Sequence, residues 1–114
     1  MKNFKKLIVW QRSMELAAQV AKLLSKFPEK ERFTYRDQIV RCSISIPSNI
    51  AEGSSRNSRK DFNRFLRISL GSSFELETQM LLLQQNKILD PEMLKIAFGY
   101  NEEVQKMLQT LLKK

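Results

Sequence analysis

The sequence contains no histidine, and among its 114 residues are only one cysteine, three glycines and three prolines. Without histidine, neither a Ser/His or Cys/His nucleophile pair nor a His/Cys zinc site can form. A single cysteine cannot form a disulfide within the chain. No apolar run approaches the roughly 20 residues that span a bilayer. We therefore expect a soluble, cytoplasmic, non-enzymatic protein with no metal, no cofactor and no membrane contact.

The composition is that of one compact domain covering residues 1–114. Hydrophobic residues make up 42% of the chain and charged residues 28%. The 20 lysines and arginines exceed the 12 acidic residues, which gives a formal net charge of +8. Such an excess favours an acidic partner, above all RNA or DNA, although many basic domains are merely well solvated.

Apolar residues recur at helical spacing from residue 7 to residue 27. They form two neighbouring stripes, and we take the first as the main buried stripe, with Trp10 in the core. The first stripe contains Leu7, Trp10, Met14, Ala17, Ala21 and Leu24, and the second contains Val9, Leu16, Val20, Leu23 and Phe27. So wide an apolar arc exceeds what one neighbouring helix covers and predicts self-association. The helix should end at Phe27, because the residue before Pro28 resists helical geometry.

Residues 42–47 alternate like a strand, yet an apolar helical face also runs through this region from Tyr35 to Ile50. A lone strand would leave its backbone unpaired, so the sequence favours a helix. Pro47 then lies inside this helix and should kink it. Gly53 marks its expected end.

Two more helices follow. A capping pattern at residues 58–61 begins the third, which runs to about Asn86. Its apolar positions are Phe62, Phe65, Leu66, Leu70, Phe74, Met80, Leu81 and Leu83. The small residues 71–73 predict close approach of a neighbouring helix. Asp90 followed by Pro91 is a strong start signal for the fourth helix. The short connections predict an all-α, up-down-up-down antiparallel four-helix bundle.

This topology would bring three basic stretches to one pole. Residues 1–12, 52–64 and 106–114 hold eleven basic and two acidic side chains, so this pole would carry more than the whole net charge. A phosphate polymer would bind there in a salt-dependent way, whereas the alternative is a solvated, lysine-rich end. The candidate nucleic-acid-binding residues are Lys2, Lys5, Lys6, Arg12, Arg56, Arg59, Lys60, Arg64, Lys113 and Lys114, with Lys106 nearby.

Residues 38–53, QIVRCSISIPSNIAEG, closely resemble the small four-helix-bundle proteins encoded by intervening sequences in bacterial 23S rRNA genes. Trp10, Phe27-Pro28 and the segment from Gly71 to Glu77 are similar to the same family, so the resemblance covers nearly the whole chain. It implies a homo-oligomeric, pentameric barrel of bundles with a nucleic-acid-associated role. Relatives include the accessory protein of diversity-generating retroelements.

The residues that carry this resemblance are expected to serve structure or assembly rather than catalysis. Polar groups between apolar positions on a helix more often pair with backbone or face another subunit than act on a substrate. These family-motif residues are Arg41, Ser45, Pro47, Asn49, Glu52, Gly53, Gly71 and Glu75.

Glu75 and Glu77 do not form a carboxylate pair, because residues two apart on a helix point in nearly opposite directions. Only a ring of identical carboxylates in an oligomer could hold a cation. Cys42 is expected to be a buried small hydrophobe.

Two functions remain open at this point. The first is a homo-oligomeric scaffold that binds RNA or DNA through its basic pole. The alternative is a protein-interaction adaptor for an acidic protein partner, in which the charge provides steering and solubility. An enzyme is a poor third candidate, since the sequence contains neither a phosphate-binding loop nor an activated nucleophile pair.

Overall fold

The computed structural model describes residues 3–114, apart from the side chains of residues 31–33, and all regular structure in this range is helical. The four long helices are α1 (Ile8–Leu23), α2 (Arg32–Ser54), α3 (Arg59–Gln85) and α4 (Pro91–Leu112). Three short 3-10 helices, η1 (Phe4–Lys6), η2 (Leu24–Lys26) and η3 (Glu29–Glu31), flank α1 and lead into α2. The predicted all-α class with four helices is confirmed. None of the described helices is long and apolar enough to cross a membrane.

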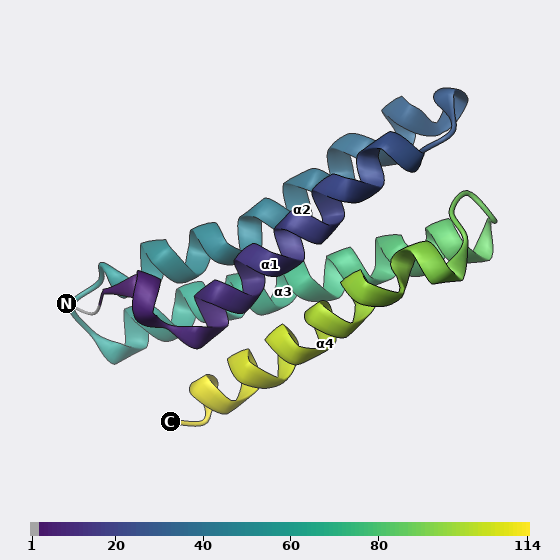
Figure 1. Cartoon of the computed structure of the whole chain (residues 1–114). Coiled ribbons are helices and arrows are strands. Elements are labelled where there is room, and N and C mark those ends of the chain that lie inside the picture. The colour runs from purple at the N-terminus through teal and green to yellow at the C-terminus, as the bar shows by residue number, and fades with distance from the viewer. Residues whose placement is uncertain (1–2) are drawn as a thin grey trace.

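The helices lie side by side in an elongated bundle of 45 × 21 × 19 Å. Each helix packs on the next one in the chain, and α1 also packs on α4. Both chain ends lie at the same end of the bundle as the α2–α3 connection, while the other two connections lie at the opposite end (Figure 1). This arrangement determines which charged side chains meet at each end.

The buried face of α1 is the second of its two apolar stripes. Leu16 and Val20 are fully buried, whereas Met14 on the first stripe is 44% exposed. The expectation that the first stripe forms the core was therefore wrong. Trp10 is half-buried at the edge of the core, with its ring edge-to-face against Phe4 at 5.3 Å between centroids. The second stripe is buried because α1 is rotated about its own axis so that this stripe, with Leu16 and Leu23, faces the axis of the bundle.

Helix α2 runs without interruption through Pro47 to Ser54. Its apolar helical face is buried at Ile39, Ile46 and Ile50, so helix rather than strand was the correct interpretation. Gly53 does not end the helix in a left-handed conformation, because no described glycine has a positive φ angle. It is instead a buried contact point, as its surroundings on α3 show.

Gly53 lies where α2 and α3 touch. A Cβ atom at this position would lie 2.7 Å from Cβ of Phe65 and 3.1 Å from Cδ1 of Phe62. Gly71 was expected to have this role, but a Cβ atom there would meet nothing within 4 Å. The close approach at residues 71–73 is made by Ser72 and Ser73, which are buried, while Gly71 faces outward.

Helix α3 begins where the sequence predicts. The Ser58 side chain accepts a hydrogen bond from the backbone N–H of Asp61 at 3.1 Å, and the helix is capped at Asn86. Phe74 and Leu81, predicted to belong to its apolar face, are 45% and 47% exposed. Their positions lie on the outward side of the helix, which the surrounding bundle does not cover.

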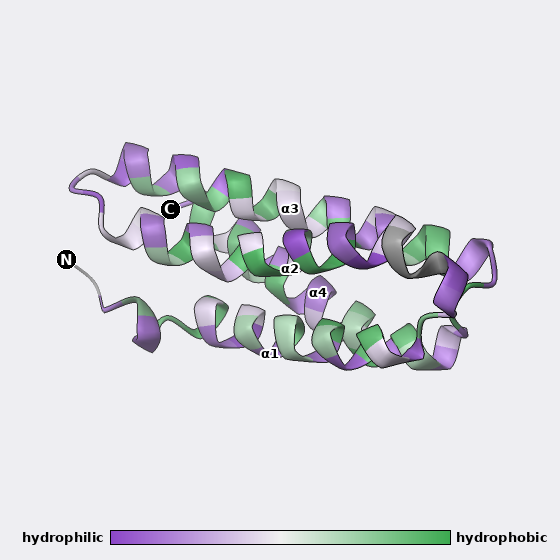
Figure 2. Ribbon diagram, turned by 90° about the horizontal axis from the view of Figure 1, so that it is seen from above, coloured by the Kyte–Doolittle hydropathy of each residue, from purple (hydrophilic) through white to green (hydrophobic). Residues whose placement is uncertain are grey.

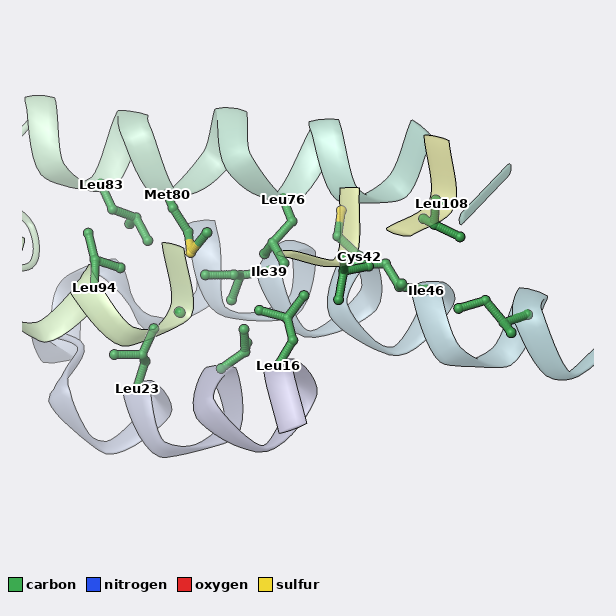
Figure 3. Packing of buried hydrophobic residues seen from close by; sticks show 14 of the residues in the cluster. Leu16, Leu23, Ile39, Cys42, Ile46, Leu76, Met80, Leu83, Leu94 and Leu108 are labelled. Carbon is green, nitrogen blue, oxygen red and sulfur yellow. The ribbon is translucent and has the colours of Figure 1, made fainter. Parts of the chain in front are cut away.

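The core is one continuous cluster drawn from all four helices. Figure 3 shows Leu16 of α1 and Leu76 of α3 pointing toward each other, and Leu94 of α4 farther along the bundle near Leu23 and Leu83. Hydrophobic and hydrophilic residues alternate along each helix (Figure 2), as expected for helices with one buried face. Asp90 occupies the N-cap position of α4 and Pro91 lies in its first turn, as predicted, although the Asp90 side chain makes no capping hydrogen bond with the described residues.

We predict that Gly53→Ala lowers the free energy of unfolding by about 1–3 kcal/mol, because the new methyl group forces α2 and α3 apart. Urea denaturation followed by circular dichroism measures this change. The matched control is Gly99→Ala in α4, where a Cβ atom meets nothing within 4 Å. This control should stabilise the protein by about 0.5–1 kcal/mol through helix propensity. Equal effects of the two substitutions would contradict a tight contact at Gly53.

Candidate nucleic-acid interface

Three separate stretches of the chain meet at the end of the bundle that carries both termini (Figure 1). The guanidinium of Arg59, at the start of α3, donates a hydrogen bond to the backbone carbonyl of Leu111 in α4. Lys6, from η1, lines one groove together with Lys106 and Leu111. The beginning of α1, the α2–α3 connection and the end of α4 are thus neighbours. Lys2 lies outside the described residues.

The arginines at this end hold the bundle together. Arg12 joins α1 to α4, since its Nε lies 3.3 Å from the Glu103 carboxylate and Nη1 lies 3.3 Å from Glu15. Arg59 joins α3 to α4 and also lies over the Phe62 ring at 5.4 Å from its centroid. Both side chains are therefore committed to contacts within the chain.

Arg56 and Arg64 enclose the ring of Phe65 from two directions. Their guanidinium carbons lie 4.8 and 4.5 Å from its centroid. Arg56 also pairs with Glu52 at 2.8 Å, and Arg64 lies 3.9 Å from Asp61. A cation stacked on an aromatic ring and paired with a carboxylate is partly neutralised, so these arginines contribute less to the field than their number implies.

The lysines differ from the arginines. Lys5, Lys6, Lys60, Lys113 and Lys114 are exposed, and none forms an ion pair with another described residue. They come from all three stretches and remain available to an anionic ligand. Lys106 pairs with Glu102 at 3.1 Å, although both side chains are largely exposed. The structure thus divides the predicted set into structural arginines and unpaired lysines.

Helix dipoles add little to this end. The N-termini of α1 and α3 lie beside the C-termini of α2 and α4, so their partial charges largely cancel. Lysine side chains therefore set the local field, and their flexible ammonium groups suit a diffuse phosphate backbone better than one fixed anion.

The polar family-motif residues of α2 pair within the bundle. Ser45 Oγ lies 2.8 Å from Ser72 Oγ across the α2–α3 contact. The Asn49 amide donates to the Ser45 carbonyl at 2.9 Å and to its Oγ at 3.0 Å. On the buried side, Ser69 Oγ donates to the carbonyl of Ile46, just before Pro47. The Ser45–Ser72 and Ser69–Ile46 contacts link α2 to α3, whereas the Asn49 hydrogen bonds lie within α2.

Four of the motif residues lie on the outside of the bundle, whereas Pro47 and Gly53 are buried. Arg41, Glu52 and Glu75 are exposed, and Gly71 faces open space. Glu75 lies toward α2, beside Cys42, whereas Glu77 accepts a hydrogen bond from Gln105 of α4 at 2.9 Å. The two carboxylates therefore point to opposite sides of α3, as their spacing predicts.

Asn101 is a buried polar residue that was not singled out in the sequence. Ser73 Oγ donates to Asn101 Oδ1 at 2.6 Å, and the Asn101 amide donates back to the Ser73 carbonyl at 3.1 Å. This pair joins α3 to α4 inside the core. The sequence does indicate a buried polar residue at this position, because Asn101 interrupts an otherwise apolar face of the fourth helix between Ala97 and Val104.

Cys42 is buried between α2 and α3 and behaves as a packing residue. Burial, which is the largest cause, together with the negative charge of Glu75 and a hydrogen bond to that carboxylate, raises the pKa of its thiol to about 11. Hydrogen bonding by Gln79 and the charge of Arg41 oppose this rise more weakly. The thiol is accordingly protonated at neutral pH and is a poor nucleophile.

We predict that alkylation of Cys42 by iodoacetamide, followed by mass spectrometry across pH, has its midpoint near pH 11. Glu75→Gln should move this midpoint to lower pH, because the substitution removes a negative charge that disfavours the thiolate. Circular dichroism at each pH checks that the chain stays folded. A midpoint near the ordinary thiol value in the folded wild type would contradict the buried placement.

The sequence and the fold of this chain are both similar to those of known proteins. The family model for the 23S rRNA-intervening sequence protein matches residues 5–110. A crystal structure of a protein of unknown function from the S23 ribosomal protein family of Bacteroides thetaiotaomicron is similar, with a TM-score of 0.84 and 28% sequence identity. The match covers 93% of this chain and 99% of that one. No curated protein matches the sequence. The chain therefore belongs to the 23S rRNA-intervening sequence protein family.

Proposed function

We propose that this protein is a non-enzymatic, homo-oligomeric helical scaffold that binds RNA or DNA through its basic end. The observation that carries the proposal is the set of five exposed lysines, Lys5, Lys6, Lys60, Lys113 and Lys114, which converge from three chain stretches without ion-pair partners among the described residues. A phosphate polymer releases counterions when such cations neutralise it, and this release supplies binding free energy.

The oligomeric part of the proposal is supported by exposed apolar side chains. Ile8, Ile44 and Ile96 are between 52% and 59% exposed and come from three helices. A monomer gains nothing from exposing them, whereas self-association would bury some of them. We propose up-down-up-down bundles that assemble into a pentameric barrel, as the family resemblance implies. Light scattering that finds only monomer at micromolar concentration would overturn this part.

One observation favours the alternative of an adaptor for an acidic protein. A groove at the basic end has an apolar floor that includes Leu7, Val9 and Met107, with Lys6 and Lys106 among its lining residues. Apolar floor and cationic lining together suit an acidic amphipathic helix. Pull-down after nuclease treatment separates the two functions. An adaptor retains its protein partner after the treatment. A nucleic-acid scaffold loses the proteins that RNA or DNA had connected to it.

We predict that the affinity for a synthetic RNA hairpin falls steeply between low and moderate salt. The double substitution Lys113→Gln and Lys114→Gln should weaken binding and lower the log–log salt slope by about 1–2, since each lost phosphate contact contributes about 0.7–0.9. Fluorescence anisotropy at several salt concentrations measures both quantities.

The matched control removes the same charge at the opposite end of the bundle. Lys26 ends η2, and Lys87 follows α3, both at the end away from the chain termini. Lys26→Gln with Lys87→Gln should leave the salt slope nearly unchanged. Equal losses in both double variants would show binding through net charge alone, and a complex insensitive to salt would refute the phosphate contacts.

A further inference from the structure

Helices α1 and α4 pack on each other, and a groove of about 520 Å³ follows their contact at the basic end. We call it the α1–α4 groove. Ile8 lies in it and is 59% exposed, although its side chain is apolar. No described part of the chain covers this surface. The lining is mostly apolar and consists of Leu7, Ile8, Val9, Met107 and Leu111 together with Lys6, Lys106 and Thr110.

A second hollow extends the groove along α4. Its volume is about 560 Å³, and it meets the α1–α4 groove at Lys106, which lines both. Ile96, Gly99 and Tyr100 line its far part, and a Cβ atom at Gly99 would meet nothing within 4 Å. From Ile96 to Leu111 the helix rises about 22 Å, which is the length of about four helical turns.

The charges along the two hollows are nearly all paired. Lys106 pairs with Glu102, and Glu103 pairs with Arg12. Among the described residues that line the hollows, only Lys6 carries a charge without an ion-pair partner. This unpaired cation lies at the basic end, so a ligand of the groove should carry its negative charge there.

An acidic amphipathic helix fits both the apolar lining and the unpaired cation. RNA is a poor occupant, because phosphate oxygens would lose water against Ile8 and Met107 without gaining a hydrogen bond there. A second copy of the chain brings a net charge of +8 toward the lysines of this end. A helix that is apolar on one side and acidic along the edges has neither drawback.

We propose that an acidic amphipathic helix of a partner protein lies along the α1–α4 groove and displaces nucleic acid from the basic end. Its apolar side covers Ile8, Met107 and Leu111, and its carboxylates lie beside Lys6 and Lys106. Displacement follows because these carboxylates neutralise Lys6, which a phosphate backbone would otherwise contact. The inference rests on the proposed nucleic-acid binding and adds its regulation.

Labelled synthetic peptides test the docking in the full-length chain. One amphipathic peptide of about four turns carries leucine on one side and glutamate on both edges, and a second carries lysine in place of every glutamate. Fluorescence anisotropy should detect binding of the glutamate peptide alone. Lys6→Glu with Lys106→Glu should weaken this peptide at least about tenfold and allow the lysine peptide to bind, an exchange that a damaged fold would not give. A glutamate peptide that does not bind the wild type overturns the inference.

A substitution in the apolar lining separates docking from simple charge attraction. Ile8→Asn should weaken the glutamate peptide about fivefold or more, because it removes apolar contact area, and it should leave the affinity for RNA unchanged. The matched control is Ile44→Asn in α2, where the side chain is 52% exposed away from the groove. This control should change neither affinity, and equal losses of peptide affinity in the two variants would contradict docking in the groove.

Competition with a labelled RNA hairpin tests the displacement. Unlabelled glutamate peptide should release the hairpin, and Ile8→Asn should raise the peptide concentration required by the factor found for direct binding. Release that Ile8→Asn does not affect, or peptide and RNA bound together, overturns the displacement. An Ile8→Asn change that turns an oligomer into a monomer in light scattering assigns the groove to a second copy and also overturns the inference. A wild type that binds the peptide but no RNA refutes the proposed function and leaves the docking standing.

Discussion

The close contact between α2 and α3 is the constraint on which the rest of the structure depends. Gly53 lets Phe65 approach the backbone of α2, and the serines at positions 45, 69 and 72 fill the remaining space while satisfying one another or a backbone carbonyl. Small polar residues cost little to bury when each has a partner. Small residues at these positions let the two helices approach each other closely.

This contact also determines the chemistry of the basic end. Phe65 packs under Gly53 and presents its ring to Arg56 and Arg64, so two cations near the α2–α3 connection are held in place by the same residue that fixes the helix pair. The arginines thereby become part of the scaffold. Lysines on both sides of them are exposed and form no ion pair with other described residues, which would suit a diffuse phosphate backbone.

Much of the fold follows from sequence because its signals are local. The Ser58 cap, Asp90-Pro91 and the apolar face of α2 each depend on residues within a few turns. Helix rotation is not local: α1 offered two apolar stripes, and only contact with the other helices decides which is buried. The same holds for Phe74, which is apolar and helical in spacing but lies on the uncovered side. For the candidate site, sequence supplied the charges, but only coordinates divided arginines from lysines.

The proposed homo-oligomer would affect how the basic end binds a ligand. In a ring whose axis runs along the helices, every copy presents its basic end on the same face. A nucleic acid longer than one site then meets several lysine clusters at once, and each later contact is intramolecular, with a high effective concentration. Under the proposed function, weak individual clusters of exposed lysines would then suffice for stable binding. Such a surface would respond to the length of the phosphate chain rather than to base sequence.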